Sequence, residues 1–233
     1  FTLRTPLQRL VEQFLFDLQP ADLPPRFNIA PTQRVSAVRV LDPVRGREYA
    51  QLHWGLIPSW ATERAIASRL INARSETVAE KPAFRRAFRQ RRCLVLADGY
   101  YEWQKTDVPG RKQPYYIRLR DDRPFGLAGL WETWQDPDGT RLETCTIITT
   151  AANELTRPIH PRMPVILAPH DYTDWLDPRA ADRAVLTRLL RPYAATAMEA
   201  YPVSTSVNNP RHDAPDCVVP APPAAGQRQL GFS

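Results

Sequence analysis

The sequence predicts an α+β fold in which mixed and antiparallel β-sheets and several helices form one domain. Between Arg92 and Thr150 the chain is rich in β-branched and aromatic residues, and Pro-Gly, Asp-Asp and Asp-Pro-Asp-Gly turn signals divide it into short runs. On either side of this stretch, apolar residues recur at helical spacing. The 233 residues contain no internal repeat and no break between two cores. We therefore expect one domain over 1–213 and a tail over 214–233 that is disordered beyond its first few residues.

The N-terminal part should contain one helix and two strands. Thr5 supplies an N-cap and Pro6 a first-turn proline, and apolar residues follow at helical spacing as far as Leu18. The proline-rich stretch 20–31 cannot form regular structure. It leads into VSAVRV and EYAQLHW, which alternate and are β-branched as strands are.

The rest of the chain should contain a second helix, a β-rich centre and two final helices. The second helix is expected over 82–90. RCLVLAD, YYEWQ, QPYYIRL, FGLAGLWETW and LETCTIITT then read as consecutive antiparallel strands. A short MPVIL strand follows, with helices around 171–176 and over 179–190.

Charge and composition limit the function classes. The formal net charge is +6, and the only lysines are Lys81, Lys105 and Lys112, so the cationic residues are nearly all arginine. Arginine suits phosphate, but a GC-rich genome also favours arginine, so charge permits a nucleic-acid partner without requiring one. No run approaches the roughly 18 apolar residues of a membrane span, and no secretory leader opens the chain. We expect a soluble cytoplasmic protein.

The three cysteines predict neither a disulfide framework nor a metal site. Cys93, Cys145 and Cys217 have no Cys-x-x-Cys spacing and no neighbouring histidine. Cys93 and Cys145 lie in apolar strand-like runs, where buried and inert thiols are expected. The sequence also lacks a phosphate-binding Gly-rich loop, so no cofactor is predicted.

Polar residues stand out in four segments with apolar surroundings: RFNIAPTQ, INARSET, DGYYEW and IHPRMPVIL. In an extended segment Asn72 and Arg74 point the same way, opposite Ile71 and Ala73, and could face one ligand. Alternatively, Asn72 caps a turn and Arg74 pairs with Glu76 or another carboxylate.

Glu102 and His160 are the candidates for proton transfer. Glu102 stands between Tyr101 and Trp103, where desolvation could raise the pKa of its carboxyl. It could instead lie on a solvated face while the aromatic residues face inward. His160 lies in a rigid connection between prolines, either as a proton donor or as a hydrogen-bonded structural histidine.

Two tryptophans could stack on nucleic-acid bases. Trp54 ends an apolar strand and is expected in the core, whereas Trp60 follows Pro58-Ser59 and should be exposed.

The order of motifs resembles that of the SRAP (SOS response-associated peptidase) family. The matching motifs are FTLRTP, RFNIAPTQ, HWGLIPSWA, INARSET, FRRAF, RRCLVLADGYYEW, AGLWE, TIITTAAN and IHPRMPVIL, and VSTSVNN resembles the closing motif. The resemblance implies a barrel-like β core with flanking helices. It implies a nucleoid-associated monomer that binds single-stranded DNA containing abasic sites, without a metal or a membrane. Mature family members begin Cys-Gly-Arg-Phe, so Phe1 should be that phenylalanine and the nucleophilic cysteine should lie just upstream.

The resemblance also implies a chemistry and roles for the site residues. The terminal cysteine's α-amine and thiol would link the abasic aldehyde as a thiazolidine, a crosslinking and lyase-like activity, after self-cleavage exposes that cysteine. Asn72 would hold the cysteine and sugar, Glu102 would handle protons at the amine, and His160 would protonate the sugar oxygen. The expected DNA contacts are phosphates at Arg74 and Arg162, bases at Trp60 and Pro31, and the DNA-binding surface at Asn28.

One position departs from the family pattern, and two other functions stay open. Some relatives carry two successive tryptophans where this chain has Trp60-Ala61. The first alternative is a non-covalent module for single-stranded DNA. The second is a peptidase or other hydrolase that acts on proteins or small molecules, with Glu102 and His160 as its acid and base.

Overall fold

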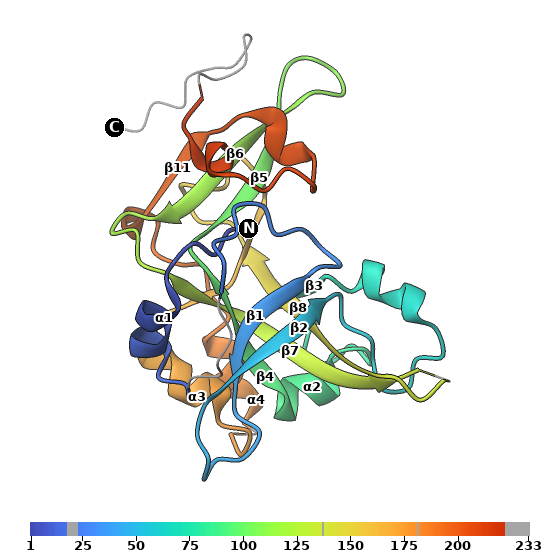
Figure 1. Ribbon diagram of the computed structural model, residues 1–233. Helices are drawn as coiled ribbons and strands as arrows, with labels where there is room; N and C mark the ends of the chain where they lie inside the picture. The colour runs from blue at the N-terminus through green and yellow to red at the C-terminus, as the bar shows by residue number, and fades with distance from the viewer. Residues whose placement is uncertain (18–22, 137, 181, 222–233) are drawn as a thin grey trace.

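A closed barrel of five strands forms the centre of the computed structural model, which describes residues 1–17, 23–136, 138–180 and 182–221 (Figure 1). Neighbouring strands around the barrel follow the order β7, β4, β1, β2 and β8, and β8 pairs with β7 to close it. β2 and β8 run parallel, whereas the other four pairings are antiparallel. The predicted α+β fold with a barrel-like core of mixed sheets is confirmed. The barrel strands are β1 (Arg34–Arg39), β2 (Glu48–Trp54), β4 (Arg92–Ala97), β7 (Phe125–Gln135) and β8 (Arg141–Ala151).

Three short strands extend the barrel sheet. β3 (Asn72–Arg74) runs parallel to β8, β9 (Arg162–Pro164) pairs with the end of β8, and β10 (Ile166–Leu167) pairs with β7. The single MPVIL strand expected from the sequence is thus divided at Val165. The Val165 N–H donates to the Ile148 carbonyl at 2.8 Å, and its carbonyl accepts from the Ala128 N–H at 2.9 Å.

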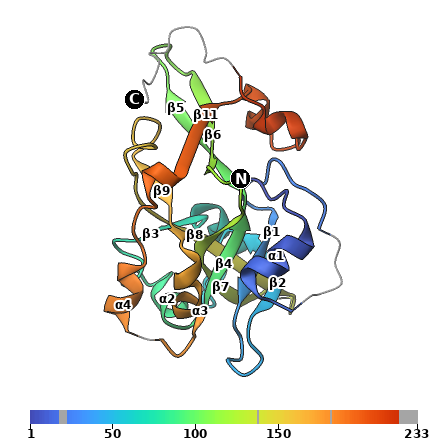
Figure 2. The same cartoon turned by 90° about the vertical axis from the view of Figure 1, so that its left-hand side faces the viewer.

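A separate three-stranded antiparallel sheet lies above the barrel in Figures 1 and 2. It contains β5 (Gly99–Lys105), β6 (Lys112–Leu119) and β11 (Met198–Pro202), of which β11 was not predicted. The expectation of five consecutive antiparallel strands is confirmed for β5–β6 and β7–β8 and is wrong for β4–β5 and β6–β7. The chain leaves the barrel sheet after β4 because Asp98 and Gly99 exchange backbone hydrogen bonds with Thr2, both at 2.9 Å.

The α-helices are short and lie beside the barrel, below the three-stranded sheet, in both views. They are α1 (Leu7–Phe14), α2 (Arg85–Gln90), α3 (Tyr172–Leu176) and α4 (Arg183–Arg188). The 3-10 helices are η1 (Arg64–Arg69), η2 (Pro169–Asp171), η3 (Ala195–Ala197), η4 (Thr205–Asn208) and η5 (Pro215–Val218), and the last two lie near the three-stranded sheet.

The helix ends differ from the predicted ones for local reasons. Pro6 occupies the N-cap of α1, and the Thr5 hydroxyl donates to Asp98 at 2.5 Å instead of capping the helix. Leu15 adopts φ 53°, which ends α1 at Phe14. The Asp182 carboxylate accepts from two backbone N–H groups and sets the start of α4 later than predicted.

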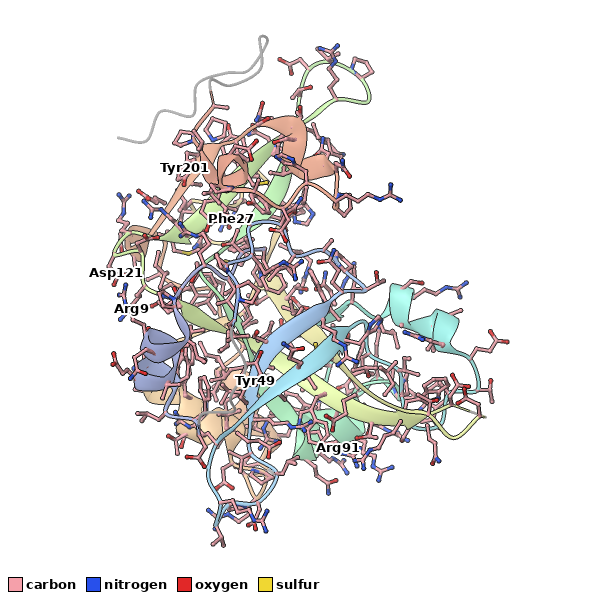
Figure 3. All side chains as sticks on the ribbon, in the orientation of Figure 1. Arg9, Phe27, Tyr49, Arg91, Asp121 and Tyr201 are labelled. Atoms are coloured by element: carbon pink, nitrogen blue, oxygen red, sulfur yellow. The ribbon has the colours of Figure 1, made fainter. Side chains whose placement is uncertain are left out.

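Buried apolar residues form three clusters in the described part of the chain, of which the smallest contains Ile57, Ala67 and Trp134. Of the other two, the larger one fills the barrel and includes Cys93 and Cys145, whose burial raises the pKa of each thiol, to about 12 for Cys93. The smaller one joins Tyr101 and Tyr116 of the three-stranded sheet to Cys217, in the part of Figure 3 where Phe27 and Tyr201 are labelled.

The first part of the predicted tail packs against this second cluster. Within 214–221 lies η5, and Cys217 is fully buried, so ordered packing continues past residue 213. The remainder of the predicted tail, 222–233, lies outside the described residues. In the described part of the chain, every helix is too short or too polar to span a membrane.

Candidate functional site

A pocket of about 610 Å³ opens between the barrel and the three-stranded sheet. The barrel strands β2, β7 and β8 and the adjoining strands β3 and β9 supply residues to its walls, and β5 supplies the facing wall. Phe1, the loop 28–31, His160 and residues around 207–210 also contribute to the lining. Five of the residues predicted from sequence line this one pocket: Asn28, Pro31, Asn72, Glu102 and His160.

Glu102 projects from β5 on the opposite face from its two aromatic neighbours. Tyr101 and Trp103 pack into the smaller apolar cluster, and alternation along the strand directs Glu102 to the other face, although all three residues contribute to the pocket lining. Its side chain is only 23% exposed. Desolvation raises the pKa of the Glu102 carboxyl, and nearby His160 partly opposes that increase. The fully solvated alternative is therefore wrong.

His160 lies beside Glu102 at the pocket. Its Nδ1 is 3.7 Å from Glu102 Oε1, close enough for an ion pair when the imidazole is protonated. The same nitrogen is 3.0 Å from the Arg162 carbonyl oxygen and 3.2 Å from the Arg162 backbone nitrogen. The turn leading to His160 is fixed by Asn153, whose buried Oδ1 accepts from both the N–H and the hydroxyl of Thr156 at 3.0 Å. Sequence reasoning did not single out Asn153.

Asn72 reaches the pocket from β3. The predicted alternation is confirmed, because Asn72 and Arg74 are exposed on one face and Ala73 is buried on the other. Parallel pairing with β8, in which Asn72 faces Ile147, fixes this short strand. The adjoining wall is held by Trp54, which packs partly against the core and donates from Nε1 to the Ile71 carbonyl at 2.8 Å.

Phe1 also lines the pocket, which no local pattern of residues predicted. Its ring packs 5.2 Å from the Trp54 ring, and its side chain is buried. Its backbone nitrogen donates to the Ile29 carbonyl at 2.9 Å. The start of the chain is thereby fixed at the pocket wall.

In the loop that contains Asn28 and Pro31, one residue is buried and the other is exposed. The Asn28 side chain is buried, and its amide nitrogen lies 2.9–3.1 Å from the carbonyl oxygens of Val207, Asn209 and His212. This amide therefore holds the 207–212 segment against the pocket, which differs from the expected contact with DNA. Pro31 is exposed at the pocket edge, as that expectation requires.

The two arginines predicted to bind phosphate lie outside the pocket lining. Arg162 forms a bidentate ion pair with Glu76, both distances being 3.0 Å, and also bonds to Thr149. The ion pair lowers the pKa of the Glu76 carboxyl. The alternative pairing of Arg74 with Glu76 is wrong, and within the described ranges no carboxylate lies within ion-pair distance of Arg74.

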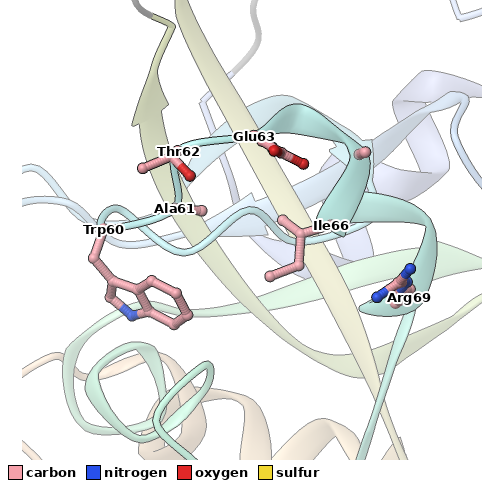
Figure 4. Close-up of a pocket in the computed structure, with 7 residues that line it drawn as sticks. Trp60, Ala61, Thr62, Glu63, Ile66 and Arg69 are labelled. Atoms are coloured by element: carbon pink, nitrogen blue, oxygen red, sulfur yellow. The ribbon is translucent and has the colours of Figure 1, made fainter.

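Trp60 occupies a separate hollow of about 250 Å³ (Figure 4). Its side chain is 62% exposed, which confirms the predicted exposure. Residues of η1 and the preceding loop form the rest of this hollow, including Ile66 and Arg69. The neighbouring Ala61 is fixed by its carbonyl, which accepts from Trp134 Nε1 at 2.7 Å.

One group of side chains could approach a metal ion. His212, Asp216 and Cys217 place their potential ligand atoms within 4.8 Å of one another, although the sequence spacing suggested no histidine close to a cysteine. The His212 Nε2 lies 2.8 and 2.9 Å from the two Asp216 oxygens, and the Cys217 thiol donates to the His212 carbonyl. These hydrogen bonds explain why the three side chains lie close together without a bound ion.

Comparison with known proteins identifies one family. The model of the family described as SOS response associated peptidase (SRAP) matches residues 1–210. Abasic site processing protein YoqW of Bacillus subtilis is 42% identical over 220 residues, which cover 94% of this chain and 97% of that protein. Abasic site processing protein HMCES of Gallus gallus is 36% identical over 198 residues, 75% of this chain and 58% of the relative.

Solved structures with the same fold include two bacterial proteins. One from Bacteroides thetaiotaomicron superposes with a TM-score of 0.73 at 34% identity and covers 82% of each chain. Another from Bordetella bronchiseptica has a TM-score of 0.72 at 30% identity and covers 87% of this chain and 97% of its own.

Proposed function

The chain belongs to the SRAP family, and from that premise we propose that it captures abasic sites in single-stranded DNA through a cysteine upstream of Phe1. Relatives named abasic site processing proteins support the substrate class. The observation that carries the proposal is the position of the Phe1 nitrogen, which lies at the pocket that also contains Asn72, Glu102 and His160. Three residues span at most about 10 Å, so a cysteine three positions before Phe1 stays within reach of these groups.

The proposed reaction forms two bonds at the aldehyde carbon of the ring-opened sugar. The α-amine of the cysteine attacks this carbon, and loss of water gives a Schiff base. The thiol then adds across the C=N bond, sulfur bonding to carbon while the nitrogen takes up a proton, and a thiazolidine ring results. An α-amine suits the first step because its pKa is about 8, lower than that of lysine, and more of it is neutral near pH 7.

The pocket residues have separate tasks in this reaction. The Glu102 carboxylate accepts a proton from the α-ammonium and returns one to the departing water, and its raised pKa suits such an exchange near neutral pH. His160 donates a proton to the sugar ring oxygen as the ring opens. The Asn72 amide holds the cysteine and the sugar in register. Self-cleavage to expose the cysteine would use the same Glu102 carboxylate.

The direct test uses a chain in which Cys-Gly-Arg precedes Phe1. We expect a heat-stable, slower-migrating band with a single-stranded oligonucleotide that contains an abasic site, and no such band with the undamaged oligonucleotide. Replacing the terminal cysteine by serine should abolish the band and leave binding in place. Binding without a band in the cysteine-bearing chain would instead identify a non-covalent module.

Self-processing is tested by the mass of the N-terminus. A precursor that begins Met-Cys-Gly-Arg should lose methionine, and Glu102→Gln should slow that loss. Equal loss of methionine in the parental chain and in Glu102→Gln would show that Glu102 takes no part in self-cleavage.

A further inference from the structure

The segment from Arg85 to Arg92 divides its five arginines into two groups. Arg92 is 2% exposed, and its guanidinium donates to backbone carbonyls that include those of Trp175 and Ala180. Arg91 pairs with Glu132 and lies over the Trp131 ring. Both arginines therefore have intramolecular partners that stabilise the fold.

The other three arginines face outward from α2. Arg85, Arg86 and Arg89 are exposed, while Ala87 and Phe88 form the buried side of the helix. Within the described part of the chain, no carboxylate comes within ion-pair distance of these three guanidinium groups. Arg86 has a weaker, longer-range electrostatic interaction with Glu132, whose carboxylate is already hydrogen-bonded to Arg91.

These exposed arginines line a hollow of about 450 Å³ together with Gln90. Arg85 and Arg89 are four residues apart, so they lie on the same side of the helix and repel one another. Among the described residues, no ion pair relieves this repulsion, whereas a bound polyanion would. Guanidinium groups, which are planar and hold several donors in a fixed fork, suit phosphate oxygens.

The helix that carries these arginines lies below β3 in both Figure 1 and Figure 2, and β3 ends at the exposed Arg74. A nucleic-acid strand that passes from the pocket over Arg74 and continues in this direction would meet α2. The two sets of arginines therefore suit successive phosphates of one backbone.

We propose that Arg85, Arg86 and Arg89 form a second phosphate-binding surface, which holds the DNA backbone flanking the lesion. This inference rests on the proposed function. The surface contributes to the affinity for long DNA and takes no part in the reaction at the pocket. It also predicts that the length of the flanking strand controls how much these arginines contribute.

The test compares two triple variants of the full chain that lose the same charge. One carries Arg85→Gln, Arg86→Gln and Arg89→Gln, since glutamine keeps helix propensity. The control carries Arg45→Gln, Arg111→Gln and Arg188→Gln, three exposed positions outside α2. Binding of undamaged oligonucleotides is measured at several salt concentrations, with single strands lengthened stepwise on the 5′ or the 3′ side. Thermal unfolding checks that both variants fold.

On long strands, the α2 variant should lose affinity, and the slope of log affinity against log salt should fall by about 2, from three phosphate contacts. The control should retain the parental slope, and on the shortest strand all three proteins should agree. Equal losses in the two variants, or a loss that does not depend on length, would overturn the proposal. Crosslinking of a short abasic oligonucleotide should continue in the α2 variant, so failure of this surface is distinguishable from failure of the proposed chemistry.

Discussion

Thr32 adopts a backbone conformation that β-branched residues rarely occupy. Its φ is 71°, in a turn whose Gln33 N–H donates to the Ala30 carbonyl at 3.3 Å. With Pro31 at the second position, this arrangement matches a type II turn, which favours glycine where Thr32 stands. The Thr32 N–H is fixed to the Trp54 carbonyl at 2.8 Å, so surrounding bonds maintain the strain and present Pro31 at the pocket edge.

Replacing this residue by glycine should therefore stabilise the protein. Thr32→Gly removes the steric cost of the positive φ, a gain that exceeds the added chain entropy by about 1 kcal/mol. The melting temperature should rise by roughly 2–4 °C in a thermal unfolding measurement. Thr62→Gly, at an exposed position without a positive φ, serves as the control and should lower it. A decrease in both variants would contradict the strain at Thr32.

The half-buried carboxylate of Glu102 should destabilise the folded state at neutral pH. Its pKa is raised in the folded protein, so the folded state binds a proton more tightly than the unfolded chain does. The resulting stability is fully present below the unfolded value of about 4.3 and is lost as pH rises through the higher folded pKa. Above that pKa, the ionised carboxylate lowers the stability of the folded state.

Glu102→Gln should accordingly raise the melting temperature at pH 7 and abolish crosslinking to abasic DNA. The gain in stability should shrink as pH falls toward about 4, because the native carboxyl is then protonated and the two side chains are both neutral. Thermal unfolding across this pH range measures the effect. Glu154→Gln, at an exposed glutamate, should show no comparable gain. A stability difference that stays constant with pH would contradict the buried charge.

At this scale the sequence predicted which side chains gather at the pocket better than how each one is bonded. Asn72, Glu102 and His160 could be found because local alternation and flanking residues mark them. The Asn28 amide was expected to contact DNA. Its actual partners could not be predicted, because they lie about 180 residues away along the chain. The partner of Arg162 is Glu76, 86 residues away, and no local pattern reveals such a pair.

Among the elements, β3 and β9 place both candidate phosphate-binding arginines on the strands that border β8. Arg74 ends β3, and its guanidinium has no ion-pair partner in the described ranges. Arg162 begins β9, and its guanidinium forms an ion pair with Glu76, which lies just beyond β3. The two guanidinium nitrogens that bond to Glu76 can contact a phosphate only if the phosphate displaces the Glu76 carboxylate.

This competition predicts opposite effects from neighbouring substitutions. Arg74→Ala and Arg162→Ala should weaken single-strand binding and each reduce the salt slope by about 0.7. Glu76→Gln should strengthen binding roughly fivefold, about 1 kcal/mol, because it frees the Arg162 guanidinium. Fluorescence anisotropy at two salt concentrations distinguishes these outcomes. Unchanged affinity in the Glu76 variant would remove Arg162 from the set of phosphate contacts.

Element prediction succeeded where hydrophobic periodicity was strong and failed where tertiary contacts decide. The long strands β7 and β8 have clear alternating or apolar runs, and α1 has a clear helical spacing. β11 was missed because Met198–Pro202 has a mixed composition and depends on pairing with β6. The pairing of β2 with β8 joins segments about 90 residues apart, which no local signal encodes.

Across the whole molecule, the C-terminal segment connects the three-stranded sheet to the pocket. Residues 207–210 contribute to the pocket wall, and the Asn208 side-chain oxygen accepts from Trp103 Nε1 at 2.7 Å. Farther along, Cys217 is buried against Tyr101 and Tyr116, and the Val218 carbonyl accepts from the Tyr201 hydroxyl at 3.0 Å. The order of this wall therefore depends on residues that lie beyond the expected domain boundary at 213.

Truncation at that boundary should be costly. A chain that ends at Asp213 loses the buried Cys217 and the Tyr201 hydrogen bond, whereas a chain that ends at Ala221 keeps both. We expect the shorter chain to be less stable by about 3 kcal/mol, and to melt roughly 10 °C lower. It should also bind single-stranded DNA more weakly, because the 207–210 wall loses support. Cys217→Ala in the longer chain should reproduce part of the stability loss. Equal melting temperatures for the two chains would show that the fold is complete at 213, and that the pocket wall is held by the Asn28 amide alone.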